Sequence, residues 1–301
     1  MVPATSVILT APEGTLETTQ RASRQQSGMG GAYGLGVRGI EVPSDQLVDA
    51  PMDWPSVTVR VRVASVSAPA FEYVAEQQAR LTVRSGGTIE IDRASGWATF
   101  TLPAAPSASA LLHPHLAAVG AVWAHWLGRE AFHAGAFVVH GGVWGVLGDK
   151  GAGKSSMLAA LASAGIPVVC DDVLVLDGSL ALAGPRSIDL RADASANLGI
   201  GEQLGVVGDR ERWRIPLPAI EPALPFRGWI ALRWAERTSI DSVQGVERLR
   251  ALLEQRALRV PPRAPATLLR LAEFPFLEFS RPRRWGDIES ASELLLDALS
   301  G

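Results

Sequence analysis

The chain has 301 residues, of which 47% are hydrophobic and 20% charged, with 30 glycines and 20 prolines. This is ordinary globular composition, and it excludes the disordered, collagen-like and disulfide-scaffold classes. The formal net charge of −3 argues against a nucleic-acid partner held through a broad basic surface, and the single cysteine, Cys170, excludes an internal disulfide and a cysteine-based zinc site.

The most apolar windows, 116–128 and 134–148, are shorter than the ~18 residues of a membrane span, and each contains a histidine. The first residues carry no basic segment followed by a long apolar one, as a signal peptide would. We therefore expect a soluble, cytoplasmic protein that has no membrane partner.

The first third of the chain is expected to be rich in β-structure. Residues 1–55 are rich in Gly, Ser, Thr and Gln and show little periodicity, which favours loops and short edge strands. Valines alternate with polar residues from Val57 to Val63, which predicts a half-buried strand. Further strands are expected over 80–84, 88–92 and 97–102, with a turn at 93–96 that joins the last two into a hairpin.

A stretch over 104–109 that is rich in Pro, Ser and Ala is typical of a linker. Strands and helices alternate beyond it, which favours an α/β class. The expected elements are a helix over about 111–131, strands over 136–140 and 143–147 joined by a turn at Gly141-Gly142, a helix over 153–164, strands over 166–170, 173–176, 179–182 and 229–234, helices over 243–257 and 264–272, a strand over 276–279 and a helix over 288–299. We therefore divide the chain into a β-rich N-terminal domain, 1–108, and a C-terminal α/β domain, 109–301.

Eight residues between an expected strand and an expected helix fit G-x-x-x-x-G-K-[ST], the phosphate-loop (P-loop) pattern of nucleotide-binding proteins. Its glycines let backbone N–H groups turn toward phosphate oxygens, and the helix directs its positive N-terminal end at the same anion. In this pattern Lys154 reaches the β- and γ-phosphates of ATP, and the Ser155 hydroxyl ligates Mg²⁺. The predicted nucleotide-binding residues are Gly148, Asp149, Lys150, Gly151, Ala152, Gly153, Lys154, Ser155 and Ser156.

Lysine usage supports this interpretation. Among the 28 basic residues only Lys150 and Lys154 are lysines, and both lie in this loop. Since arginine does not replace lysine where a compact ammonium group is needed, their retention here favours a phosphate site.

An acidic pair follows the loop closely. Asp171 and Asp172 come 17 and 18 residues after Lys154, so that one helix and one strand bring them back beside it. The only asparagine, Asn197, is followed by Leu, which excludes the Asn-Lys-x-Asp motif of GTPases. The Leu-Ser-Gly-Gly signature of transporter ATPases is also missing from the sequence.

Residues 133–177, HAGAFVVHGGVWGVLGDKGAGKSSMLAALASAGIPVVCDDVLVLD, resemble the catalytic core of bacterial HPr kinase/phosphorylase and its relatives. In that family a histidine precedes the loop lysine by 21 residues, where this chain has His133, and an Asp-Asp pair follows it at the spacing of Asp171 and Asp172. The resemblance implies that Asp172 takes the proton from an acceptor hydroxyl. It also implies that Asp171 helps to hold Mg²⁺ and that His133 lies near the transferring phosphoryl group.

The residue types themselves agree with that implication. Phosphoryl transfer needs positioning, charge neutralisation and a group that accepts the hydroxyl proton. Two adjacent carboxylates beside a metal ion divide these tasks into ligand and base, because strand alternation points their side chains to opposite sides. The less interesting alternatives are a strand-end turn with solvated carboxylates for the acidic pair and a structural histidine for His133.

The chain departs from that family in residues 187–205, where the family carries a further Mg²⁺-binding Glu and a signature rich in Gly and Leu. Asp189, Asp193 and Glu202 are the candidates there for the missing ligand. The resemblance therefore favours divergent relatives, which phosphorylate a Ser hydroxyl on a peptide precursor or on a small molecule.

Several weaker features are expected to be structural. His113-Pro114-His115 is interpreted as a loop leading into a helix, His140 as a strand-end residue and Cys170 as a small buried residue. The first of two arginine groups could reach a phosphate or an acidic substrate, and the second, with Trp285, could form a patch for acidic peptides. A solvated edge strand is favoured for the first group and a surface turn for the second. The groups are Arg210, Arg212 and Arg214, and Arg281, Arg283 and Arg284.

Together these features predict an α/β P-loop kinase domain, HPr-kinase-like, preceded by a β-rich N-terminal domain. The predicted activity is that of an ATP-dependent phosphotransferase with Mg²⁺ and ATP as cofactors. Its acceptor is an alcohol, most plausibly a Ser or Thr hydroxyl of a peptide precursor or of a small molecule. The predicted catalytic residues are Asp172, His133, Lys154 and Asp171, with Ser155 and Asp171 as metal ligands. A nucleotide-gated binding module and an NTPase that needs no acceptor are the alternatives, and homo-oligomerisation is left open.

Overall fold

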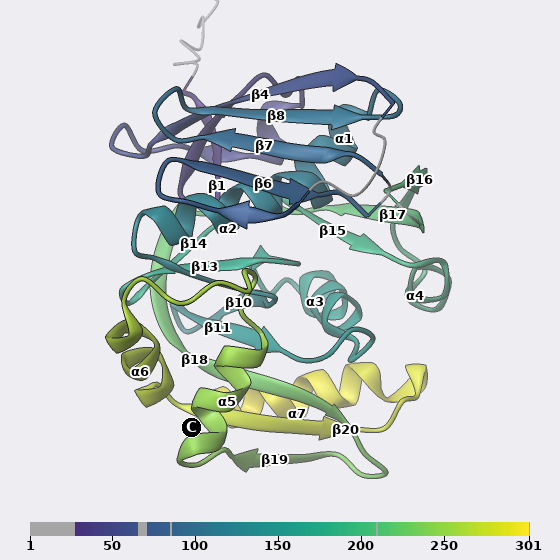
Figure 1. Ribbon diagram of the computed structural model, residues 1–301. Helices are drawn as coiled ribbons and strands as arrows, with labels where there is room; N and C mark the ends of the chain where they lie inside the picture. The colour runs from purple at the N-terminus through teal and green to yellow at the C-terminus, as the bar shows by residue number, and fades with distance from the viewer. Residues whose placement is uncertain (1–27, 66–70, 85, 209, 301) are drawn as a thin grey trace, which may run out of the picture.

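The computed structural model describes residues 28–65, 71–84, 86–208 and 210–300. It shows mixed α/β architecture with a β-rich N-terminal region, built on three sheets (Figure 1). The expectation of loops and short strands over 1–55 is met from residue 28 onward, and its first 27 residues lie outside the described part. Within that part, none of the helices is long and apolar enough to cross a membrane.

An eight-stranded sheet forms the N-terminal region, at the top of Figure 1, in the order β3-β1-β2-β4-β8-β7-β6-β5. A short 3₁₀ helix over Ser44–Gln46 precedes β3. The strands are β1 Gly30–Ala32, β2 Leu35–Arg38, β3 Val48–Asp49, β4 Ser56–Val63, β5 Tyr73–Val74, β6 Gln78–Thr82, β7 Thr88–Asp92 and β8 Trp97–Leu102. The predicted 88–92 and 97–102 hairpin is therefore confirmed at both strands, which pair antiparallel.

Only the first half of the valine alternation in β4 corresponds to buried side chains. Val57 and Val59 are buried, whereas Val61 and Val63 are exposed. Strand periodicity gives the face on which a side chain lies, but not how far along the strand the core continues. The pairing of β4 with β2 ends at Thr58, so the second half of β4 has a neighbouring strand, β8, on one side only.

The predicted helix over 111–131 is wrong at both ends. It is broken at His113, whose extended backbone precedes Pro114, because proline disfavours the helical conformation in the residue before it. The regular helix α2 is Leu116–Trp126, and Gly128 follows with a φ of +74°. The next residues form strand β9, Glu130–Phe132. A short helix α1, Ala108–Ala110, lies in the predicted linker and is capped by Ser107.

Helix α2 lies between the N-terminal sheet and the strands β13 and β14 below it (Figure 1). It is buried on nearly all sides, and one continuous cluster of buried residues includes Phe100 of the sheet, Val119 of α2 and Leu174 of β13. Backbone hydrogen bonds also join the two regions, from Tyr33 N–H to Ala183 O at 2.7 Å and from Arg186 N–H to Gln46 O at 2.9 Å. The division at 108/109 stays a prediction.

A nine-stranded sheet forms the centre of the C-terminal region. Seven strands follow the order β12-β10-β11-β18-β14-β13-β9, and β20 and β19 extend it from β18. The strands are β10 Gly135–Val139, β11 Gly142–Leu147, β12 Val168–Cys170, β13 Leu174–Asp177, β14 Leu180–Leu182, β18 Ala223–Trp234, β19 Ser239–Ser242 and β20 Phe276–Arg281. Strand β18 runs parallel to both β11 and β20.

The predicted turn at Gly141-Gly142 is displaced by one residue. His140 and Gly141 have φ values of +50° and +71° and form the turn, while Gly142 begins β11. A histidine in the left-handed region is uncommon but tolerated in such a turn. His140 also lies 3.0 Å from the Ser300 hydroxyl through its Nε2 atom.

The remaining elements flank this sheet. A three-stranded sheet has the order β15-β17-β16, and helix α3 packs against β15, β10 and helix α7. The helices α5 and α6 pack on each other. Their bounds are β15 Ser187–Leu190, β16 Glu202–Val207, β17 Arg210–Pro216, α3 Lys154–Ser163, α4 Ala192–Leu198, α5 Val246–Glu254, α6 Pro265–Glu273, a 3₁₀ turn Trp285–Asp287 and α7 Ile288–Ser300.

Candidate active site

A glycine loop, residues 148–153, connects the end of β11 to the start of α3. Gly148, Gly151 and Gly153 have φ values of +153°, +90° and +85°, which residues with a Cβ rarely adopt. Gly153 is the N-cap of α3, and no side chain caps this helix end. The first N–H groups of a helix have no partner within the helix, so this end presents free donors to solvent.

Lys154 begins α3 and folds back over the loop. Its ammonium group donates hydrogen bonds to the carbonyl oxygens of Gly148 and Asp149, the second at 3.5 Å. Burial lowers the pKa of Lys154, and the nearby carboxylates of Asp172 and Asp171 oppose this shift. The structure therefore brings the predicted lysine, the loop and the acidic pair together.

The other predicted loop residues differ in accessibility. Asp149, Lys150 and Gly151 are exposed, Ala152 is buried, and Ser155 and Ser156 at the start of α3 are half-buried. Asp149 accepts a 3.4 Å hydrogen bond from the side-chain amide of Gln255.

Asp171 follows β12 and is buried beside the start of α3. One carboxylate oxygen, Oδ2, accepts a 3.1 Å hydrogen bond from the backbone N–H of Asp189, while the buried Oδ1 has no hydrogen-bond partner. Burial raises the pKa of this carboxyl to about 6, and His113 and the Ser155 side chain oppose the rise. A buried acceptor without a donor is costly, which suggests that it serves a ligand.

Asp172 and His133 lie on the solvent side of this group. Asp172 is half-buried and His133 is exposed. Protein atoms around the imidazole lower the pKa of His133, the charge of Lys154 lowers it further and that of Asp172 opposes the shift. The backbone N–H of His133 donates to the Gln255 carbonyl at 2.7 Å, which fixes the segment between β9 and β10.

The donor set fits a magnesium ion that is shared with a nucleotide. In the described part of the chain no group of three or more His, Cys, Asp or Glu side chains could hold a metal ion by itself. Mg²⁺, however, commonly takes one or two protein oxygens and completes its shell with phosphate oxygens and water. The Ser155 hydroxyl and the unpartnered Oδ1 of Asp171 are the two residues that would hold it.

The candidates for a further metal ligand do not fit that role. Asp189 is buried, but Arg214 donates to both of its carboxylate oxygens, at 2.7 and 2.9 Å, and Arg212 donates to one at 3.4 Å. Burial would raise the pKa of Asp189, but His113 and the two arginines outweigh it and the pKa is lowered. Asp193 and Glu202 are exposed.

The favoured interpretation of the first arginine group is therefore wrong. β17 is the central strand of its sheet and not an edge strand, and Arg212 and Arg214 are buried. Asp189 on β15 stands directly opposite Arg214 in the strand register. The Asp189 carboxylate compensates the cost of burying the two guanidinium charges. Because this partner lies on another strand, the alternation of residues along β17 does not reveal it.

The second arginine group is a surface turn only in part. Arg283 and Arg284 are exposed, but Arg281 is buried at the end of β20. Its guanidinium group lies against the glycine loop and 4.3 Å from the ring centre of Trp234. Packing between neighbouring strands accounts for the difference, since β18 and β20 end side by side at this loop.

The histidine pair and the cysteine have the structural roles expected of them. His113 and His115 are buried in the irregular turn before α2, and the Nε2 atom of His113 lies 3.9 Å from Asp189. Cys170 is fully buried at the end of β12. Burial raises the pKa of its thiol well above the ordinary value, which favours an inert side chain.

Tyr33 is a residue near the site that pattern analysis did not identify. It is buried in the turn between β1 and β2, and burial together with the charge of Asp172 raises its pKa. A tyrosine in a Gly-rich segment carries no local signal for such a contact. The N-terminal region thus reaches the vicinity of Asp172.

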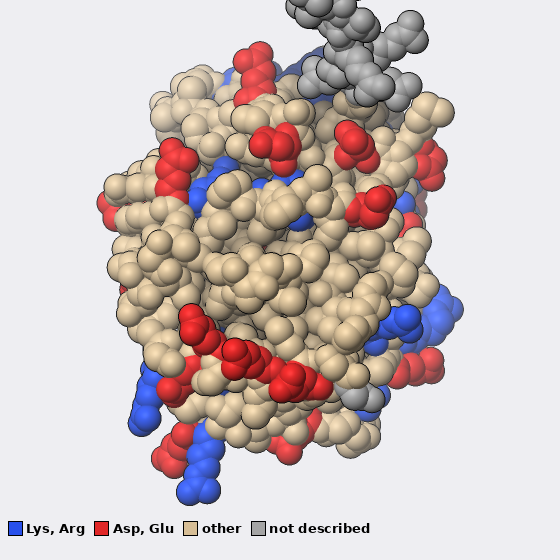
Figure 2. Space-filling model, turned by 180° about the vertical axis from the view of Figure 1, so that it is seen from behind, with Lys and Arg blue, Asp and Glu red and all other residues tan. Residues whose placement is uncertain are grey.

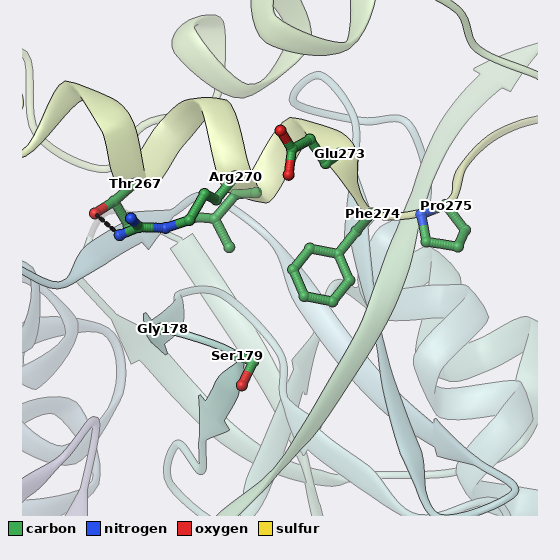
Figure 3. Close-up of a pocket in the computed structure, with 8 residues that line it drawn as sticks. Gly178, Ser179, Thr267, Arg270, Glu273, Phe274 and Pro275 are labelled. Carbon is green, nitrogen blue, oxygen red and sulfur yellow. Dashed lines mark hydrogen bonds between the residues drawn. The ribbon is translucent and has the colours of Figure 1, made fainter.

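A cavity of about 540 Å³ lies elsewhere. Figure 3 shows it between helix α6 and the turn at Gly178 and Ser179, with Arg270 and Phe274 among its lining residues. None of the predicted site residues lines it.

The face shown in Figure 2 carries a row of acidic side chains across its lower half, and no broad basic area covers it.

Comparisons with known proteins add little. No family model matches the chain, and no curated protein matches it. Among the solved structures that do match is the HPr(Ser) kinase/phosphatase from Coxiella burnetii, with 15% sequence identity and a TM-score of 0.30. The match covers 57% of this chain and 99% of that chain.

Proposed function

We propose that this protein is an ATP-dependent phosphotransferase that transfers the γ-phosphoryl group to an alcohol. The observation that carries this proposal is the convergence of the glycine loop, Lys154, Asp171, Asp172 and His133 at one end of α3. These groups come from three separate parts of the chain. A glycine-rich connection with a purely structural role would not require them to meet.

Nucleotide binding rests on the loop and the first turn of α3. Its free N–H groups and the positive end of the helix attract phosphate oxygens. Lys154 adds a compact positive charge, and its ammonium group contacts the carbonyls of Gly148 and Asp149. On nucleotide binding we expect its ammonium group to leave these carbonyls for the β- and γ-phosphates.

A magnesium ion would be held by Ser155 and Asp171, and when bound it neutralises charge on the phosphates. Asp189 keeps Asp171 in place through its backbone N–H, and its own carboxylate is held by Arg214 and Arg212. The Asp171 carboxylate is thereby oriented before any ligand arrives.

Asp172 is the proton acceptor in this proposal. As the acceptor oxygen forms a bond to the γ-phosphorus, the bond from that phosphorus to the β–γ bridging oxygen breaks and ADP leaves. The acceptor hydroxyl gives its proton to the Asp172 carboxylate. His133, with its pKa lowered, is a neutral imidazole near neutral pH and can donate one hydrogen bond to the transferring group.

The acceptor is proposed to be a Ser or Thr hydroxyl of a peptide or the hydroxyl of a small molecule. In support, His133 and Asp172 lie at the accessible side of the site, where an acceptor can approach. Residues 1–108 are proposed as the domain that contacts this acceptor, since Tyr33 already lies near Asp172.

The test is transfer of label from γ-labelled Mg·ATP into a pool of peptides and metabolites, with wild type, Asp172→Asn and Asp297→Asn compared. Asp297 is an exposed aspartate of α7 and serves as the matched control. We expect labelled alcohol phosphate with wild type and the control, and a loss of about 10² or more with Asp172→Asn at nearly unchanged ATP affinity. Transfer by Asp172→Asn at the wild-type rate would remove Asp172 from its role.

Two other results would replace the proposal. Label released only as free phosphate would indicate an NTPase that needs no acceptor. ATP binding without any turnover, across peptide and metabolite pools, would indicate a nucleotide-gated binding module.

A further inference from the structure

Three successive carbonyl groups of the glycine loop are held from behind by two side chains. The indole N–H of Trp234 donates a 3.0 Å hydrogen bond to the Gly151 carbonyl. The Nη2 atom of Arg281 lies 3.5 Å from the Ala152 carbonyl oxygen and 3.3 Å from that of Gly153. The carbonyl group of each of the last three loop residues, 151–153, therefore accepts a hydrogen bond from one of these two side chains.

The two side chains form one unit. Trp234 is the last residue of β18 and Arg281 the last residue of β20, and they are direct partners in the parallel register of these strands. The guanidinium carbon of Arg281 lies 4.3 Å from the centre of the indole ring, as in a cation–π contact. Both strands belong to the central sheet, so the unit is anchored on a rigid element.

The loop approaches this pair so closely that no side chain fits between them. A Cβ atom at Gly153 would lie 2.5 Å from Nη2 of Arg281 and 3.0 Å from Cη2 of Trp234. Glycine is therefore required at 153 by this contact as well as by its φ of +85°.

Among the described residues, the buried charge of Arg281 has no carboxylate partner. The residue is 4% exposed, its Nε atom has no hydrogen-bond partner, and no carboxylate in the described ranges lies within ion-pair distance of it. Burial lowers the pKa of Arg281 to about 10. A buried cation whose partners are neutral, namely loop carbonyls and the Trp234 ring, adds positive potential at the start of α3, where an anion would bind.

Peptide geometry links these contacts to the opposite side of the loop. In a trans peptide the C=O group and the following N–H group point in opposite directions. Carbonyls of Ala152 and Gly153 that are held toward the strands leave the N–H groups of Gly153 and Lys154 pointing away from them, to the side where phosphate would lie. The Gly153 carbonyl also accepts a 3.0 Å hydrogen bond from the Met157 N–H group of α3. The pair and the first turn of α3 thus set the direction of the phosphate-binding donors together.

We propose that Trp234 and Arg281 are positioning residues, a Trp–Arg clamp that presets the glycine loop for the phosphates of a nucleotide. This inference rests on the proposed nucleotide site, and it goes beyond it in assigning two residues that the P-loop pattern does not contain. The clamp acts on phosphates and not on the base. It should therefore affect all ligands that carry a diphosphate.

The experiment compares the dissociation constants of MgATP, MgADP and Mg-pyrophosphate for wild type, Arg281→Met, Arg281→Lys and Trp234→Phe. Arg283→Met is the matched control, since Arg283 also lies beside Trp234, at 5.9 Å from its ring, but is exposed and is not hydrogen-bonded to the loop. Arg281→Met should weaken all three ligands by about 10-fold or more, because hydrogen bonds from a charged group are lost. Trp234→Phe should weaken them by about 3-fold, and Arg281→Lys should lie between Met and wild type because it keeps the charge without the planar donor fork.

Each outcome is informative. Equal binding by wild type and by a folded Arg281→Met or Trp234→Phe would overturn the clamp while leaving the nucleotide site intact. An equal loss of affinity with Arg283→Met would show that positive surface charge in general, and not the loop contact of Arg281, supports binding. A loss confined to MgATP and MgADP would indicate that Trp234 recognises the base. Either result would overturn the clamp. If wild type binds none of the three ligands, and Lys154→Met behaves the same, the proposed function fails and the clamp fails with it.

Discussion

The N-terminal and C-terminal regions differ most in the charges that they bury. Within the described residues up to 108, no charged side chain is buried, and the interior is aliphatic and aromatic apart from the hydroxyl groups of Thr88 and Tyr33. From residue 109 onward several charged side chains are buried, and most of them lie around the glycine loop and Asp171. They are Glu130, Asp171, Arg186, Asp189, Arg212, Arg214 and Arg281.

This contrast is informative because burying a charge costs free energy unless partners compensate it. The described part of the N-terminal sheet avoids this cost, since none of its charged side chains is buried and its ion pair between Arg80 and Glu90 is solvent-exposed. In the C-terminal region Glu130 pairs with Arg256 at 3.1 Å, and most of the other buried charges surround Asp171 or lie behind the glycine loop. Arg186, for example, donates to the Val168 and Pro218 carbonyls, both at 2.8 Å, and so holds the strand that leads to Asp171.

The largest expected effect comes from removing the centre of the buried network. Asp189→Asn leaves Arg212 and Arg214 buried without a counter-charge, and we expect a loss of about 3–5 kcal/mol in the free energy of unfolding. Glu90→Gln breaks the exposed ion pair of the N-terminal sheet and should cost about 0–1 kcal/mol. Urea denaturation of the two variants measures both values. Similar losses would contradict the distinction between the regions.

The pH dependence of stability should also originate in the C-terminal region. Asp171 has a folded-state pKa of about 6, against an ordinary value of 3.8, so the folded state binds the extra proton between these values. Wild-type stability should therefore fall as the pH rises from about 4 to about 6, by roughly 1–3 kcal/mol relative to Asp171→Asn, and then stay level. The measurement is denaturation in metal-free buffer at several pH values. A constant difference between the two proteins would contradict the raised pKa.

The smallest expected effect on the site comes from a change in the N-terminal core. Ile89 is buried in β7, and Ile89→Val should cost about 0.5–1.5 kcal/mol of stability with no change in MgATP affinity. Ile188→Val, beside Asp189 in β15, makes the same truncation in the C-terminal region. Calorimetric titration of MgATP into both variants checks this. A weakened affinity in Ile89→Val would show that the N-terminal core is coupled to the site.

Local features of the fold could be predicted where one segment carries the whole signal. The 88–92 and 97–102 strands have alternating side chains and a Gly-containing turn, and the structure places them at those residues. The strand, glycine loop and helix around Lys154 were likewise found in the expected order. The predicted helix over 111–131 failed where its apolar pattern continued through Pro114 and Gly128, two residues that end helices.

From the amino-acid pattern we could predict the glycine loop, the spacing of His133, Asp171 and Asp172 around Lys154, and most of the alternation of strands and helices. Which charges are buried follows from the packed fold alone: Asp189 is paired with Arg212 and Arg214, and Arg281 lies behind the loop and not at the surface. The φ preference of glycine and the periodicity of a strand are properties of neighbouring residues. The free energy of a buried charge depends instead on a partner 23 to 129 residues away in the chain.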